Sequence, residues 1–239
     1  MKKLLICAFF ALTLAGQNFQ HVRLYKVKRD RMAEWQSAIQ DLMAIYKKAN
    51  VDAPTAVYQS LTGPEQFAIV RRYDKISQAV ASRADAFKGN FEAEYRAANI
   101  RLMATVEDRE TRVTEIKPEL SIRDSTVPAP YLRVARVRVK PGRQDEMRAV
   151  LKEMMSAGMK PAGVKLYLVT ETRMGGPVGE FTTSLAVPAL TDLDESAARK
   201  AMGEVKYASW AAKRDAVTES AEVNLYRYRP ELSNWNPKP

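Results

Sequence analysis

The sequence has almost no cysteine or histidine. Its 239 residues include one cysteine, Cys7, and one histidine, His21. Cys7 lies in the apolar run near the start, which we predict to be cleaved, so the mature chain would have no cysteine and we expect neither disulfides nor cysteine-based metal or redox chemistry. A single histidine cannot supply a histidine-based zinc or iron site, or a serine–histidine pair for nucleophilic catalysis. We therefore expect no catalytic residue of these classes, no metal and no cofactor.

Long apolar runs are also missing, apart from one short run near the start. Lys2 and Lys3 are followed by apolar residues from Leu4 to Leu14 and then by small residues suited to cleavage. This run is shorter than the ~20 residues that a membrane-spanning helix needs. The pattern is typical of a secretory signal peptide. We predict a signal peptide at residues 1–16 and an exported protein, periplasmic or secreted, without stable membrane insertion after cleavage.

The charge balance is basic but shows no concentrated block of one sign. There are 38 lysines and arginines against 28 acidic residues, a net charge of +10. In an exported protein this excess suggests acidic envelope polymers, anionic lipid surfaces or small anions as partners rather than nucleic acid. The basic residues are spread through both halves, which favours an ordinary solvated surface. We expect no nucleic-acid partner.

One pattern occurs twice in the chain, at a separation of 112 residues. The motif Pro118-Glu119-Leu120-Ser121 recurs as Pro230-Glu231-Leu232-Ser233, and the residues of 131–155 match those from residue 19 onward at the same separation. A repeat of this length is the size of a domain and exceeds the ~20–50 residues of a solenoid repeat. We predict units at 19–117 and 131–230, a linker at 118–130 and an irregular tail at 231–239.

Both units show the same order of predicted elements. Alternating and β-branched runs indicate strands, and apolar residues spaced three and four apart indicate helices. The order β-α-β-β-α-β is ferredoxin-like: it puts the helices on one face of an antiparallel sheet and leaves the other face uncovered. We therefore predict an α+β fold in which two such units pack sheet to sheet as a pseudo-dimeric α+β barrel, with a monomer as the plausible state. The expected strands are 19–28, 55–61, 66–73, 106–116, 131–140, 164–173, 180–187 and 219–228, and the helical regions are 31–49, 75–104, 145–158 and 192–216.

A short segment of the second unit resembles a known superfamily. Val139-Lys140-Pro141-Gly142-Arg143, followed by a helix opening with Asp145-Glu146-Met147, is similar to the first strand, turn and helix of the dimeric α+β barrel superfamily. That group includes antibiotic-biosynthesis-type monooxygenases and NIPSNAP-type proteins. The first unit departs from the motif, with Arg29-Asp30 in place of Pro141-Gly142. The resemblance implies a barrel that members usually form by dimerising, and a pocket that aromatic residues near Trp210 can line. Haem enzymes on such barrels use a helical histidine, which this chain lacks.

The predicted barrel interior carries charged side chains of both signs. Strand alternation places every second residue on the face between the two halves. Because an isolated buried charge costs several kcal/mol, these residues must be paired or bound. Either they form ion-pair networks that fix how the halves dock, or they line a polar pocket for a small acidic or carbonyl-bearing ligand. The candidate ligand-binding residues are Lys26, Glu110, Arg136, Arg138, Glu222 and Tyr226.

Two classes of function remain open from the sequence. The first is non-catalytic binding of a small molecule or a partner in the cell envelope. The alternative is an enzyme, either a cofactor-free monooxygenase or an isomerase acting on a small aromatic or ketone substrate. In that enzyme Glu222 and Tyr226 would be acid–base groups and the arginines would hold an anion. A cavity lined by these residues would favour a binder or an enzyme, and a filled, ion-paired barrel would favour a structural or interaction protein.

Overall fold

Both halves of the chain fold in the order β-α-β-β-α-β. The computed structural model describes residues 18–51, 54–81, 84–125 and 127–235, and the expected signal peptide at 1–16 lies outside them. The predicted strands are present, with ends that differ by about two residues or less, as boundary assignments commonly do. The first half contains β1 (Phe19–Val27), η1 (Arg29–Arg31), α1 (Met32–Lys48), β2 (Thr55–Ser60), β3 (Phe67–Tyr73), α2 (Ile76–Val80), η2 (Ala84–Ala86), α3 (Asn90–Ala104) and β4 (Val106–Ile116). The rest contains η3 (Pro118–Leu120), β5 (Ile122–Arg123), β6 (Tyr131–Val139), α4 (Gln144–Glu153), η4 (Met154–Met159), β7 (Leu166–Met174), β8 (Glu180–Val187), η5 (Leu190–Leu193), α5 (Ala197–Met202), α6 (Glu204–Val217), β9 (Thr218–Tyr228) and η6 (Pro230–Leu232).

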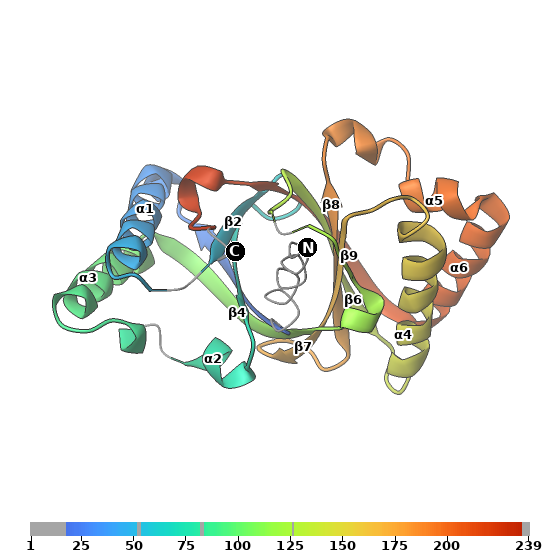
Figure 1. Cartoon of the computed structure of the whole chain (residues 1–239), viewed down its shortest axis with the longest axis horizontal. Helices are drawn as coiled ribbons and strands as arrows, with labels where there is room; N and C mark the ends of the chain where they lie inside the picture. The colour runs from blue at the N-terminus through green and yellow to red at the C-terminus, as the bar shows by residue number, and fades with distance from the viewer. Residues whose placement is uncertain (1–17, 52–53, 82–83, 126, 236–239) are drawn as a thin grey trace, which may run out of the picture.

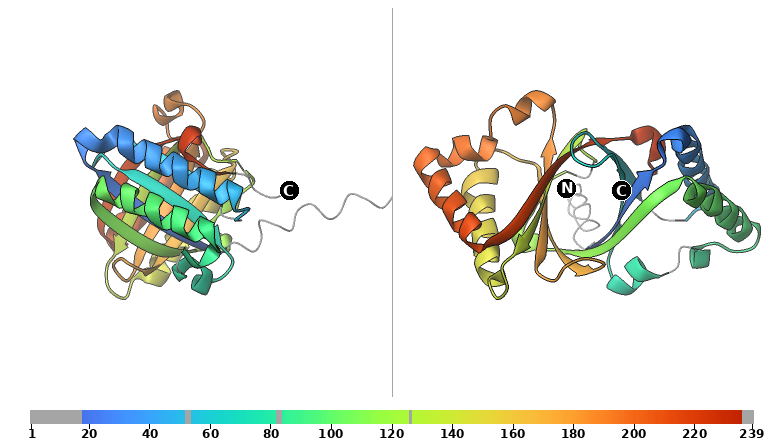
Figure 2. Two further views of the ribbon diagram at one scale, coloured as in Figure 1. Left: turned by 90° about the vertical axis from the view of Figure 1, so that its left-hand side faces the viewer. Right: turned by 180° about the vertical axis from the view of Figure 1, so that it is seen from behind.

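The strands form one closed antiparallel barrel. Their order is β4-β1-β3-β2 in the first half and β9-β6-β8-β7 in the second. Strand β2 pairs with β9, and β4 pairs with β7, so the half-sheets are hydrogen-bonded at both junctions. The expected pseudo-dimeric α+β barrel is therefore present, with its two sheets joined edge to edge as well as facing each other. Figure 1 looks into the barrel, with the helices of the two halves on opposite outer sides, and Figure 2 shows the same arrangement from behind.

Each half has its own apolar core between its helices and the outer face of its strands. In the first half, Trp35 of α1 is fully buried and packs on Phe67 with ring centroids 4.1 Å apart. In the second, Met147 of α4 and Phe181 of β8 are buried in the same way. Trp210 belongs to this second core, where its Nε1 donates to the Val150 carbonyl at 2.9 Å. The pocket role that the family resemblance implied for the Trp210 region is therefore wrong for Trp210 itself.

The strand–turn–helix segment of the second half forms as predicted. Gly142 has φ = 76°, a conformation that glycine adopts without steric cost, and it allows β6 to turn directly into α4. Asp145 and Glu146 lie in the first turn of the helix, where they stabilise the positive end of its dipole. The helix then continues as one π-helical stretch, η4, which the apolar spacing alone does not reveal.

The described residues of the expected linker and tail include regular elements. Within residues 118–130, η3 and β5 are regular elements, and β5 pairs with β7. Within the described part of 231–239, Leu232 is fully buried and Asn234 forms a bridge with Thr55. The described parts of the predicted linker and tail therefore contain short regular elements that the sequence did not indicate. Both segments are rich in proline and polar residues, and their order comes from tertiary contacts that local sequence does not show.

Candidate functional site

A cavity of about 120 Å³ lies inside the barrel. Its wall is mostly apolar, because the inward-facing positions of β1, β2, β3 and β6 carry chiefly alanine, valine, leucine and tyrosine. Both halves contribute, and residues after β4 and after η6 complete the wall. An engineered apolar cavity of about 150 Å³ accommodates benzene, so this space suits a molecule of about one ring. The lining residues are Gln20, Val22, Leu24, Ala56, Tyr58, Ala68, Val70, Arg72, Arg112, Thr114, Ser125, Val127, Pro128, Leu132, Val134, Arg136, Leu166, Leu168, Thr170, Thr182, Ser184, Asn224, Tyr226 and Trp235.

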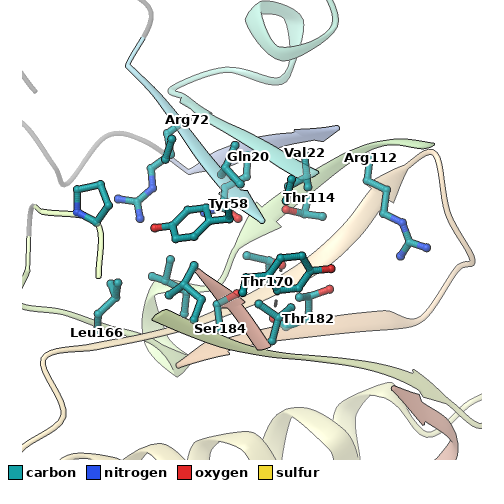
Figure 3. Close-up of a pocket in the computed structure, with 18 of the residues that line it drawn as sticks. Gln20, Val22, Tyr58, Arg72, Arg112, Thr114, Leu166, Thr170, Thr182 and Ser184 are labelled. Atoms are coloured by element: carbon teal, nitrogen blue, oxygen red, sulfur yellow. Dashed lines mark hydrogen bonds between the residues drawn. The ribbon is translucent and has the colours of Figure 1, made fainter. Parts of the chain in front are cut away.

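Charged groups line the cavity at its two ends, and the two ends differ. Figure 3 shows Arg72 and Arg112 on opposite sides of the cavity. We call them the Arg72 end and the Arg112 end. Between them, the hydroxyls of Thr114, Thr170 and Ser184 interrupt the apolar wall.

The Arg112 end is a network of paired charges that joins the two halves. Arg112 pairs with Glu110 on its own strand β4 and with the buried Glu180 of β8. Arg136 of β6 pairs with Glu222 of β9 and lies 3.6 Å from Glu110, measured from Nη1 to Oε2. Each carboxylate of this set therefore faces an arginine, as buried charges require.

The acid–base groups predicted from the sequence lie at or beside this network. Burial alone would raise the pKa of Glu222, but hydrogen bonds from Asn224 and Arg136 outweigh it and hold that pKa below its usual value. Burial raises the pKa of Tyr226, whose hydroxyl receives a hydrogen bond of 2.7 Å from Gln66 Nε2. Glu222 is therefore a charged, occupied acceptor, and Tyr226 is a neutral phenol at the cavity wall.

The structure divides the predicted ligand-binding residues into two groups. Arg136 and Tyr226 line the cavity, and Glu110 and Glu222 bind the arginines at its Arg112 end. The other two lie outside the lining, in half-exposed ion pairs. Lys26 Nζ is 2.7 Å from Glu107, and Arg138 Nε is 3.2 Å from Glu219. Neither of these two residues is part of the cavity lining.

The Arg72 end holds a positive charge that is not paired with any carboxylate of the described residues. Arg72 is largely buried, its guanidinium lies 5.7 Å from the centre of the Trp235 ring, and no ion pair involves it among the described residues. Burial, and then the nearby charge of Arg123, lower the pKa of Arg72 to about 10, so it stays protonated at neutral pH. Figure 3 shows the Tyr58 hydroxyl directed toward this guanidinium. Burial raises the pKa of Tyr58, which is therefore a neutral hydrogen-bond donor.

Sequence reasoning did not identify Arg72 or Tyr58. Strand β3 carries arginine on both faces, with Arg71 turned toward the helices and Arg72 toward the cavity. Alternation alone cannot tell which of the two faces inward. The informative signal is the pairing register, in which Arg72 lies beside the inward-facing Gln20.

The described residues form neither a metal-binding cluster nor a membrane-spanning helix. Those residues contain no group of three or more histidine, cysteine, aspartate or glutamate side chains arranged to hold a metal ion. No helix in the same ranges has the length and apolarity needed to cross a membrane. The single histidine, His21, is buried in β1 next to Arg71 and Val113 in the sheet.

Comparison with known proteins identifies the fold. No protein-family model matches the chain, and no curated protein matches its sequence. Several solved structures do match. A proposed monooxygenase from Fusobacterium nucleatum matches at TM-score 0.65 and 11% identity, and the match covers 89% of this chain and 93% of that protein's chain. A proposed monooxygenase from Lactobacillus acidophilus matches at TM-score 0.61 and 10% identity, covering 89% and 94%. An anthrone oxidase-like protein matches at TM-score 0.58 and 10% identity, covering 91% and 94%. The chain therefore has the dimeric α+β barrel fold that the Pro-Gly motif predicted, and these neighbours match it across both halves.

Proposed function

We propose that the protein binds a small, largely apolar molecule inside its barrel without converting it, as an exported protein of the cell envelope. The observation that carries this proposal is the cavity itself. A barrel serving only to hold the two halves together would be filled by side chains, as small barrels commonly are. Here the interior keeps about 120 Å³ of space with a mostly apolar wall. The envelope location rests on the amino-terminal pattern of residues 1–16.

The ion-paired Arg112 end supports binding rather than catalysis. Its arginines and carboxylates are already matched to one another. A group that is fully engaged in a structural pair is poorly placed to accept or release a proton during a reaction. This network therefore fixes the shape of the barrel, while the apolar wall and the opposite end are left to recognise a ligand.

Binding inside the barrel can be tested by filling the cavity. Ala68 lines the cavity and is buried, so Ala68→Leu adds volume where a ligand would lie. Ala221 of β9 is exposed, so Ala221→Leu is a matched control on the outside. We expect ligand-observed NMR with one-ring aromatic compounds to show binding to the wild type and to Ala221→Leu, and none to Ala68→Leu. Equal binding by all three proteins would place the ligand elsewhere, and no binding to any would leave a protein–protein role.

A second candidate function is a cofactor-free monooxygenase. It is favoured by the fold shared with two proposed monooxygenases and an anthrone oxidase-like protein, whose identities of 10–11% support the fold alone. In such a reaction the substrate supplies the electrons, one atom of O2 enters the product and the other leaves as water. Oxygen consumption with a one-ring hydroquinone as substrate tests it, because a molecule of that size fits the cavity. Turnover that is lost in Tyr226→Phe and Glu222→Gln would replace the binding proposal, and absence of turnover would leave it in place.

A further inference from the structure

Two buried polar groups at the cavity have neither a hydrogen-bond partner nor an ion-pair partner among the described residues. They are Nε of Arg72 and Oγ1 of Thr114, and Thr114 is only 3% exposed. Polar atoms in protein interiors are nearly always hydrogen-bonded, so each such group needs an explanation. Both belong to residues of the cavity wall, and each atom itself has almost no accessible surface, so contact with a bound molecule requires a small side-chain rotation.

The two groups lie in one row across the first half-sheet. Gln20 of β1 pairs with Arg72 of β3 on one side and with Thr114 of β4 on the other. Neighbouring strands are ~4.8 Å apart, so the backbones of Arg72 and Thr114 are separated by ~10 Å. Because the arginine side chain is long and lines the cavity, a molecule of one ring with a polar group at each end spans the distance between the two side chains.

The barrel does not need an arginine at this position. In the second half, Leu132 of β6 corresponds to Gln20, since the repeat separation is 112 residues, and Leu132 pairs with Ala186 of β8. The same place in the same fold is therefore filled by alanine. Burying an uncompensated charge is unfavourable, and a fold requirement does not account for it here.

The chemistry of the Arg72 end matches a carboxylate. A guanidinium group offers a planar fork of donors that fits two carboxylate oxygens, and such charge-assisted bonds are stronger than neutral ones. The Tyr58 hydroxyl is directed toward the same point and can donate to the same anion. Beyond the charged end, the wall is formed by residues such as Val70, Leu132 and Leu168 and suits a ring.

We propose that the barrel cavity binds a one-ring aromatic monocarboxylate. Its carboxylate pairs with Arg72 and Tyr58, its ring lies against the apolar wall, and a ring hydroxyl reaches Thr114. This inference rests on the proposed function and specifies its ligand class. The residues that carry it are not those that the sequence predicted, because the arginine of the ligand site is Arg72 and Arg136 belongs to the ion-paired network.

The test compares an acid with its neutral analogue by isothermal titration calorimetry on the full-length mature chain. The probes are 4-hydroxybenzoate, 4-hydroxybenzamide and benzoate. A hydrogen bond to a charged group contributes ~1.5–3 kcal/mol, so Arg72→Met is expected to weaken 4-hydroxybenzoate about 10- to 150-fold and to change 4-hydroxybenzamide less than about threefold. Arg138→Gln removes an equal charge outside the cavity and is expected to change neither affinity.

The hydroxyl contact is tested separately with Thr114→Val, which keeps the shape of the side chain. It is expected to weaken 4-hydroxybenzoate about three- to tenfold and to leave benzoate unchanged. If neither acid nor amide binds the wild type, both the inference and the small-molecule version of the proposed function fail. If the amide binds as tightly as the acid, or if Arg72→Met retains acid binding, the ligand class is overturned while binding in the barrel stands.

Discussion

Arg72 is a charged residue kept in a place where a neutral one would serve the fold. Its guanidinium faces the cavity, touches the Trp235 ring and has the like charge of Arg123 nearby. Burial and the like charge of Arg123 disfavour the charged form, so the pKa falls to about 10, below its usual value, while the Trp235 ring face favours the cation. The residue therefore costs stability in the absence of an anion, as is common for groups that serve binding.

Replacing Arg72 by methionine is expected to stabilise the protein by about 1–3 kcal/mol at pH 8, because the buried charge disappears while similar volume remains. The direction of the Arg72 pKa shift also determines how the stability of the wild type depends on pH. A base whose pKa is lower in the folded state binds fewer protons folded than unfolded once the pH reaches about 10, so wild-type stability rises with pH from there toward the usual arginine pKa. Urea unfolding at pH 8 and pH 10.5 should show the advantage of Arg72→Met shrinking at the higher pH. A variant less stable than wild type at both values would contradict this account.

The two copies of the Pro-Glu-Leu-Ser motif act as reciprocal clamps between the halves. Leu120 of η3, which follows the first half, is buried in the core of the second, and Leu232 of η6 is buried in the core of the first. Ser121 Oγ accepts from the Val169 backbone N–H at 2.9 Å, and Ser233 Oγ accepts from that of Val57 at the same distance. The motif that follows the first half therefore completes the core of the second, and the motif that follows the second half completes the core of the first.

The clamps predict which half each substitution loosens. Leu232→Ala removes buried volume from the first core, and Leu120→Ala removes it from the second, at an expected cost of about 2–5 kcal/mol each. Hydrogen exchange should show lost protection in β2 and α1 for Leu232→Ala, and in β7 and α4 for Leu120→Ala. Val178 is 92% exposed, so Val178→Ala serves as a control with little expected effect. Loss of protection in the half adjoining the mutated clamp in sequence would argue against reciprocal clamping.

The whole molecule is one closed barrel made from two open half-sheets. Pairing of β2 with β9 and of β4 with β7 leaves neither half-sheet with a free outer edge strand at these junctions. The charge network at the Arg112 end crosses between the same halves. Each half therefore depends on the other for hydrogen bonds, for charge pairing and for part of its core.

Separate halves are expected not to persist as folded monomers. Residues 17–130 alone would expose the unpaired edges of β2 and β4 and lack Leu232, and residues 131–239 alone would expose those of β7 and β9 and lack Leu120. We expect circular dichroism and size-exclusion chromatography to show unfolded or self-associated halves, and a 1:1 mixture to recover a folded species of the size of the intact chain. If either half folded by itself as a stable monomer, the two halves would not be one cooperative folding unit.

The sequence predicted the strand order and the barrel well because both rest on local periodicity and on a long internal match. Alternation also assigned Arg136 and Tyr226 to the interior correctly. It could not show that the helices of the second half leave the outer face of β9 uncovered, so that Val223 is 47% exposed. Nor could it show Arg72, whose inward orientation depends on register, or the clamps, whose order comes from contacts with distant strands.

The reciprocal clamps have a consequence for the making of the protein. A chain is synthesised from its amino terminus, so the first half is complete long before Leu232 exists to fill its core. The native core of the first half is therefore complete only after Leu232 has been synthesised, so the last part of the chain is needed to finish packing the first part.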